Sequence, residues 1–257
     1  MPSIPPEEEE VPTGFKDSME VLLVNYFDPL TRRIKLMTLD WALKNSEEFI
    51  EKVLGKPDLK EPLLRMEVEE VLRSEVIFTV MQLCEDLLYV FETYKYTSAD
   101  PVATFKTILK APQILSGIER KEAGDLLDWL SWPPKLAAGQ DPLVTDGLKQ
   151  FRDFLGRVRK FYFKHLQLYN CYKHGHRLAY IISFGTDNEP YPTMLYFPPE
   201  EDRYLAEVIR VEDVGVELKL ADDILEVASV AKENWLTRRR DEASGQFTLS
   251  LPLRGRS

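Results

Sequence analysis

Cysteine, histidine and glycine are scarce in this sequence, which holds two, three and 12 of them among 257 residues. Two cysteines are too few for a disulfide scaffold, and their scarcity favours a reducing, cytoplasmic location. The glycines form no nucleotide-binding loop of the Walker or dinucleotide type, and no Gly-x-Ser-x-Gly elbow occurs. We therefore expect no cofactor.

Long apolar runs are also absent. No stretch reaches the roughly 18 uninterrupted apolar residues that a membrane helix needs. The first residues have neither the basic region nor the apolar core of a secretory signal. Residues 1–14 hold several prolines and the acidic run from Glu7 to Glu10, so we expect a disordered acidic tail there. A membrane is accordingly not among the expected partners.

The spacing of apolar residues predicts a mainly α-helical fold. Apolar positions recur in steps of three and four, which is the spacing of one helix face. The helices predicted in this way cover 15–54, 62–94, 143–173 and 221–240. A proline- and glycine-bearing loop over 131–142 interrupts the helical run.

After Gly175 the apolar period changes to short runs separated by Gly, Asn, Asp and Pro, which predict strands and turns. The predicted strands cover 178–184, 194–197, 206–211, 216–220 and 247–251. The predicted organisation is therefore a helical bundle over 15–176, followed by a smaller α+β part over 177–257.

The net charge of −10 argues against a protein that coats nucleic acid along its whole surface. The charge is unevenly distributed, however: between Lys149 and Arg177 lie eight basic residues and only one acidic residue, Asp153. The predicted helix over 143–173 has an aromatic, apolar face and a basic opposite face. The residues on which we expect nucleic acid to bind are Lys149, Arg152, Arg159, Lys160, Lys164 and Lys173.

The histidines are concentrated at the end of this helix, since His165, His174 and His176 lie within twelve residues. One interpretation is an ordinary helix end, in which Gly175 terminates the helix and basic residues complement its negative pole. A second is a metal site formed by Cys171, His174 and His176, for which His165 is the nearby residue that could supply a fourth ligand. The sequence excludes neither interpretation, but we expect no metal there.

A third interpretation rests on a resemblance. The run Asn170-Cys171-Tyr172-Lys173-His174-Gly175 at the end of a long helix resembles the signature of the HEPN superfamily, the higher-eukaryote and prokaryote nucleotide-binding domain. Its ribonuclease members carry an Arg, then a polar residue that is often Asn, then His and frequently Gly. Asn170, His174 and Gly175 match this pattern, whereas Tyr169 stands at the Arg position.

The resemblance implies a helical bundle that binds RNA or cleaves it without a metal, commonly as a homodimer, in prokaryotic defence, toxin–antitoxin or stress-response systems. His174 would move the proton of the 2′-hydroxyl or of the leaving oxygen, and Asn170 would orient it or bind phosphate. Arg177 would replace the missing guanidinium, or Arg157 or Arg159 would do so from a dimer partner.

Loss of the transition-state cation costs on the order of 10²–10⁴ in rate, so the fold can persist without catalysis. The alternative function is a catalytically inactive HEPN-like module that binds a protein or nucleotide partner.

Overall fold

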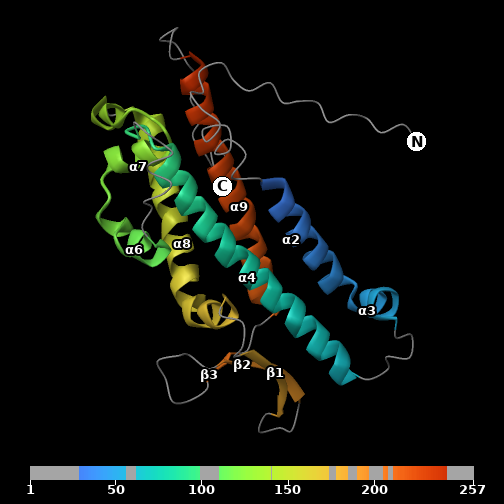
Figure 1. Cartoon of the computed structure of the whole chain (residues 1–257). Coiled ribbons are helices and arrows are strands. Elements are labelled where there is room, and N and C mark those ends of the chain that lie inside the picture. The colour runs from blue at the N-terminus through green and yellow to red at the C-terminus, as the bar shows by residue number, and fades with distance from the viewer. Residues whose placement is uncertain are drawn as a thin grey trace, which may run out of the picture.

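Three helices of more than 30 residues dominate the structure, a computed structural model that describes residues 29–55, 62–98, 110–139, 141–173, 178–184, 190–196, 205–207 and 211–241. These helices are α4 (Pro62–Tyr94), α8 (Pro142–Lys173) and α9 (Val211–Asp241) (Figure 1). Within the described ranges the chain is mainly α, with seven α-helices and one small antiparallel sheet. None of the helices in these ranges combines the length and apolarity needed to cross a membrane.

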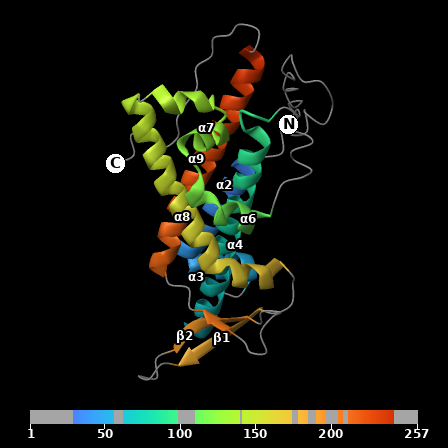
Figure 2. The same cartoon turned by 90° about the vertical axis from the view of Figure 1, so that its left-hand side faces the viewer.

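The shorter elements surround the long helices. They are α2 (Pro29–Lys44), α3 (Ser46–Leu54), α6 (Ala111–Ser116), the 3-10 turns η1 (Ile118–Arg120) and η2 (Pro134–Gly139), and α7 (Ala123–Trp129). The antiparallel sheet has the order β1-β2-β3, with β1 over Leu178–Phe184, β2 over Pro190–Tyr196 and β3 over Leu205–Glu207. The sheet lies at one end of the helices, where Met194 of β2 is buried and its sulfur lies 3.8 Å from the Ser74 hydroxyl of α4 (Figure 2).

Helix α4 forms the centre of the fold, with α8 on one side and α2 on the other (Figures 1 and 2). Consecutive pairs such as Ile77–Phe78 and Val80–Met81 are fully buried, so the helix is enclosed on more than one face. A helix that is apolar around most of its circumference belongs in the interior of a bundle.

Aromatic pairs connect α4 to three other helices. The Phe91 ring lies 5.1 Å from that of Trp129 in α7 and 5.6 Å from that of Phe151 in α8, as measured between ring centroids. One turn later, Tyr94 lies 4.8 Å from Trp235 in α9. Aromatic pairs at such distances contribute about 0.5–1.5 kcal/mol beyond the area they bury, so these contacts stabilise the packing of α7, α8 and α9 on this end of α4.

Several sequence predictions are confirmed. The predicted helices over 62–94 and 143–173 correspond to α4 and α8, and the predicted strand over 178–184 is β1. The predicted helix over 15–54 is described from Pro29 onwards, where it is two helices divided at Asn45. The predicted strand over 247–251 lies outside the described residues, as does the predicted acidic tail.

The predicted strand over 216–220 is wrong, because α9 already begins at Val211 and is helical through this stretch. Apolar residues alternate here, as in a strand, but Val216 is 70% exposed. The buried positions Val214, Glu217 and Leu220 recur every three residues instead, so packing of a helical face against the bundle overrides the local alternation. The predicted domain boundary at residue 176 remains a prediction, although α9, beyond that boundary, contacts α4.

Ser131, directly after α7, provides a test of the packing between α7 and α4. It is fully buried, has a φ of 61° and donates a hydrogen bond from its hydroxyl to the Tyr94 carbonyl at 2.8 Å. Ser131→Ala should lower the free energy of unfolding by about 0.5–1.5 kcal/mol, because this buried hydrogen bond is lost. Ser131→Gly should be the milder change, because a left-handed φ costs a residue with a Cβ about 1 kcal/mol. Urea unfolding measures both; an alanine variant more stable than the glycine variant would contradict this local geometry.

Candidate functional site on helix α8

Helix α8 has the two faces that its sequence predicts. Its buried side includes Phe151, Leu155, Val158 and Tyr162. Five of the six residues expected to bind nucleic acid lie on the other side: Lys149, Arg152, Lys160 and Lys164 are exposed, and Arg159 is half-buried. The sixth, Lys173, is exposed but lies on the side of α8 that faces α4, where it pairs with Glu85. The structure thus brings five of these residues to one helix surface, while their role in binding remains a prediction.

Several of these cations already have partners within the chain. Arg159 forms an ion pair with Glu119 of the loop after α6, and Arg152 donates to the Lys121 carbonyl at 3.0 Å. Arg157 lies 2.8 Å from the buried carboxylate of Asp223 in α9. These three guanidinium groups therefore hold α8 to neighbouring elements, and a phosphate would have to compete with their present partners.

The loop after α6 also adds charge to this surface. Arg120 is exposed and Lys121 is half-buried, and the contacts of Arg152 and Arg159 place this loop along the basic side of α8. A groove of about 350 Å³ with a mainly apolar lining lies beside the first turns of α8 and has Lys149 and Arg152 among its lining residues. The basic surface is thus broader than α8 alone, which the helix sequence could not indicate.

At the position of the family's arginine, the Tyr169 side chain is directed into the protein. It is 1% exposed, and its hydroxyl donates to a Glu85 carboxylate oxygen of α4 at 3.2 Å. Tyr162 donates to the same carboxylate at 3.1 Å, and the Lys173 ammonium lies 2.7 Å from it. Glu85 therefore receives three donors from one helix, and Tyr169 has no surface available for an external phosphate.

The electrostatics of this cluster keep both phenols protonated. Burial raises the pKa of Tyr162 and of Tyr169 far above the ordinary value, and the charge of Glu85 and its hydrogen bonds raise it further. The Lys173 ammonium offsets the carboxylate charge and lies 4.8 Å from the centre of the Tyr169 ring. Glu85 is the site residue that sequence analysis missed. Its only signal was a carboxylate among the apolar residues of the second half of α4, where Asp86 and Glu92 are also acidic.

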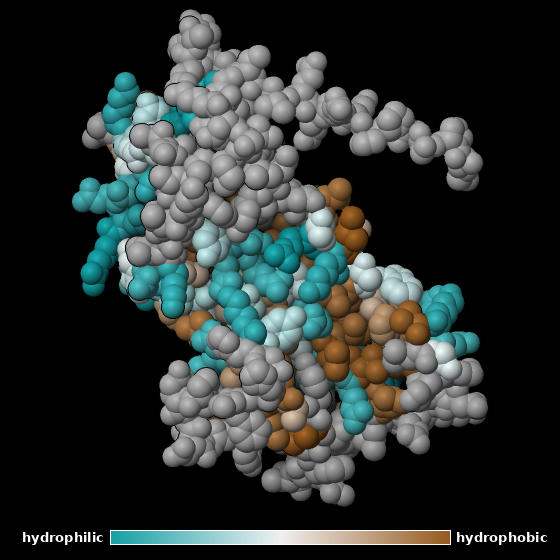
Figure 3. Space-filling view, in the orientation of Figure 1, coloured by the Kyte–Doolittle hydropathy of each residue, from teal (hydrophilic) through white to brown (hydrophobic). Residues whose placement is uncertain are grey.

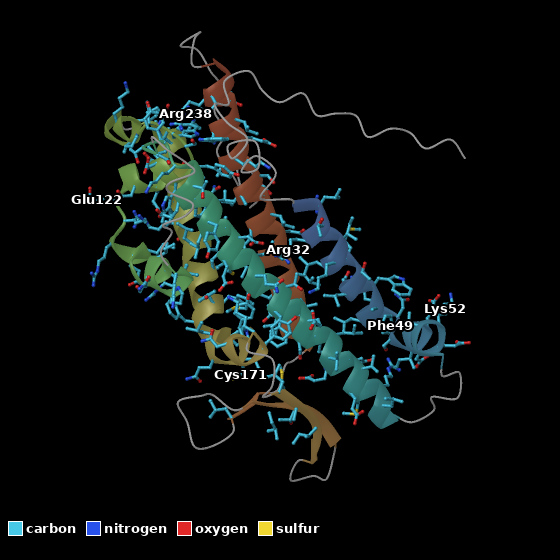
Figure 4. All side chains as sticks on the ribbon, viewed as in Figure 1. Arg32, Phe49, Lys52, Glu122, Cys171 and Arg238 are labelled. Carbon is cyan, nitrogen blue, oxygen red and sulfur yellow. The ribbon has the colours of Figure 1, made fainter. Side chains whose placement is uncertain are left out.

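A second group of polar residues lies between α4 and α2. Arg32 of α2 lies 3.1 Å from Asp86 and donates to the Gln82 side chain at 2.8 Å, and Figure 4 shows it between the two helices. Burial raises the pKa of Asp86, and the nearby Arg32 opposes this shift. Further along the same border, Lys35 of α2 forms an ion pair with Glu75 of α4. The polar residues of α4 thus serve to attach its neighbours.

The predicted catalytic residues are only partly within the described structure. Asn170 is exposed near the end of α8, whereas His174, Gly175 and Arg177 lie outside the described residues. Cys171, which Figure 4 shows at this helix end, is buried. The mutual geometry of Asn170, His174 and Arg177 is therefore not part of the description, and their catalytic roles remain predictions.

His165 lies in the core rather than in the candidate site. Its side chain is 1% exposed, and its Nε2 lies 3.4 Å from a carboxylate oxygen of the buried Glu217 in α9. The Phe161 ring contacts the imidazole at a centroid distance of 4.9 Å. In the part of the chain that the structure describes, no group of three His, Cys, Asp or Glu residues lies close enough together to hold a metal ion.

Comparison with protein-family models, with curated proteins and with solved structures finds no match to this chain.

The buried phenols predict how stability depends on alkaline pH. A group whose pKa is raised on folding stabilises the native state fully below its unfolded pKa, which is about 10 for tyrosine. The wild-type free energy of unfolding should therefore fall as pH rises above about 10. In the double variant Tyr162→Phe/Tyr169→Phe this fall should be much smaller. At pH 7 the same variant should be less stable by about 1–3 kcal/mol per lost bond to a carboxylate.

Urea unfolding at several pH values, together with absorbance titration of the phenols, measures both effects. If the free energy of unfolding of the double variant fell above pH 10 as steeply as that of wild type, Tyr162 and Tyr169 would not be the phenols whose pKa is raised by folding.

Proposed function

We propose that this chain is a HEPN-like RNA-binding protein, a helical bundle followed by a smaller α+β part, whose phosphate-binding surface is the exposed face of α8. Four cations of that face, Lys149, Arg152, Lys160 and Lys164, are exposed. They span positions 149–164, or about 22 Å along the helix axis. This length suits a stretch of several nucleotides.

The observation that carries the proposal is an exposed aromatic ring among the cations. Phe163 is 40% exposed and lies between Lys160 and Lys164 in sequence on α8. The Arg159 guanidinium lies 5.8 Å from the centre of the Phe163 ring. An aromatic side chain next to Lys and Arg residues is the arrangement on which single-stranded bases stack while the cations bind the backbone.

A further feature supports close approach of a ligand to this face. Gly156 lies on the exposed side of α8 between Arg152 and Lys160, and a Cβ added to it would meet nothing within 4 Å. Glycine within a helix costs up to about 1 kcal/mol relative to alanine. The missing side chain leaves room for a phosphate backbone beside α8 at this position.

Binding is favoured over catalysis, because no cation stands at position 169. Tyr169 donates to Glu85 from within the core, and Lys173 pairs with the same carboxylate. An active endoribonuclease would need His174 and Asn170 together with Arg177. The second candidate is an inactive interaction module that binds a protein or nucleotide. This candidate is favoured by the ion pairs that Arg157 and Arg159 form with Asp223 and Glu119, because guanidinium groups paired within the chain are less available to phosphates.

RNA binding is tested with a fluorescent single-stranded oligonucleotide and a series of salt concentrations. Lys160→Ala/Lys164→Ala should weaken binding and reduce the salt slope by about one to two, because two phosphate contacts are lost. Phe163→Leu should weaken binding of single-stranded RNA roughly 5- to 100-fold without changing the salt slope, because stacking is lost.

Lys52→Ala is the matched control, since Lys52 is an exposed lysine on α3, away from α8 (Figure 4). It should leave the affinity unchanged. Equal affinities for wild type and the α8 variants, or binding that is indifferent to salt, would reject α8 as the RNA surface and leave the interaction module.

Catalysis is tested by incubating the purified protein with RNA in EDTA, comparing wild type with His174→Ala. We expect both proteins to bind RNA and neither to cleave it above the buffer background, because the transition-state cation is missing at position 169. Cleavage by wild type alone would establish a metal-independent nuclease that uses His174, and Arg177→Ala would then identify the substitute cation.

A further inference from the structure

Helix α2 exposes a continuous apolar stripe. Leu30 is 62% exposed, Ile34 55%, Met37 65% and Trp41 43%. Their spacing of four, three and four residues places them on one side of the helix. Brown, apolar residues gather over this part of the molecule in Figure 3. A contiguous apolar surface of this kind marks a site of protein association.

We propose that this stripe is the interface through which two copies of the chain associate, with the two α2 helices antiparallel. In that arrangement Ile34 of one copy faces Met37 of the other, and Leu30 faces Trp41. The stripe is thus complementary to itself about a two-fold axis, as a symmetric dimer requires.

The charges beside the stripe favour a second copy and select the antiparallel orientation. Arg33 and Asp40 flank the stripe on one side of α2, seven residues apart. In an antiparallel pair, Arg33 of each copy faces Asp40 of the other, which forms two ion pairs. In a parallel pair, the two-fold axis would place these residues of the two copies on opposite sides of the contact, and the intermolecular ion pairs could not form.

The present partners of these two residues leave them available. Arg33 lies 3.8 Å from Asp222, with both side chains more than half exposed. Asp40 pairs with Lys44 of the same helix, whose side chain is 70% exposed. Exposed pairs of this kind contribute only about 0–1 kcal/mol each, so exchange for an intermolecular pair costs little.

A groove next to the stripe enlarges the surface on this side. It holds about 290 Å³ between α2 and α9, with Leu36, Leu218 and Leu225 among its lining residues and Arg33 and Asp40 beside them. The exposed parts of the four stripe residues amount to on the order of 400 Å² per copy, comparable to the largest patch on an ordinary monomer. Two such stripes bury on the order of 800 Å² in total, below the roughly 1,200–2,000 Å² of stable specific complexes, so we expect weak association with micromolar dissociation.

Sedimentation equilibrium of the full chain over about 1–100 µM, a range set by the expected affinity, tests the proposal. Wild type should show a reversible monomer–dimer equilibrium. Met37→Glu should weaken it at least tenfold, because two charges would be buried beside the two-fold axis. Leu143→Glu is the matched control: Leu143 is 56% exposed on α8, on the other side of α4, and this change should leave the dimer intact.

A charge exchange tests the orientation and does not depend on the folding of the Met37 variant. Arg33→Glu and Asp40→Lys should each weaken the dimer, and the double variant Arg33→Glu/Asp40→Lys should restore it, because the antiparallel pairs reform with opposite sign. Circular dichroism checks that each variant is folded.

A monomer at every concentration, or a dimer insensitive to Met37→Glu in a folded protein, would overturn the proposal. RNA affinity measured in the same variants keeps this result separate from the proposed function, since α2 variants should bind RNA as wild type does.

Discussion

The central physical constraint is a carboxylate within a helix that the rest of the protein encloses. Glu85 lies one turn from fully buried residues of α4, where an unpartnered charge would be strongly unfavourable. Tyr162, Tyr169 and Lys173 supply its donors, and they lie at intervals of seven and four residues along one face of α8. This need for donors determines how the last three turns of α8 lie on α4, and with them the direction in which Asn170 is exposed.

The same principle divides the molecule into internal contacts and exposed surfaces. Polar residues along the border of α4 hold α2 through Arg32 and Lys35, while the guanidinium of Arg157 holds α8 to α9. Two surfaces of the described residues carry the proposals: the basic, aromatic face on α8 and the apolar stripe on α2, which lie on opposite sides of α4 (Figures 1 and 2). The two proposed binding functions therefore do not compete for space. In a dimer formed through α2, the two α8 faces point away from one another.

Much of the secondary structure could be predicted from the sequence, because long helices bury a periodic face. The predicted ranges 62–94 and 143–173 match α4 and α8 for this reason. The start of α9 could not be predicted, since the buried polar residue Glu217 interrupts its apolar face and its partner His165 is far away in the sequence. Likewise, the face of Tyr169 was predicted, but its hydrogen bond was not, because Glu85 lies 84 positions earlier. Pairings over such separations depend on the packed tertiary structure.

The Glu85 cluster also restricts which substitutions position 169 can accept. An arginine introduced at position 169 would enter the core beside the Glu85 carboxylate and form an ion pair there, displacing Lys173 before it met any external phosphate. Changing Glu85 alone would leave two buried phenols without their acceptor. Each single step is therefore unfavourable, and an arginine at position 169 would require coordinated changes in α4 and α8. Evolutionary change at position 169 is thus coupled to position 85, far away in the sequence.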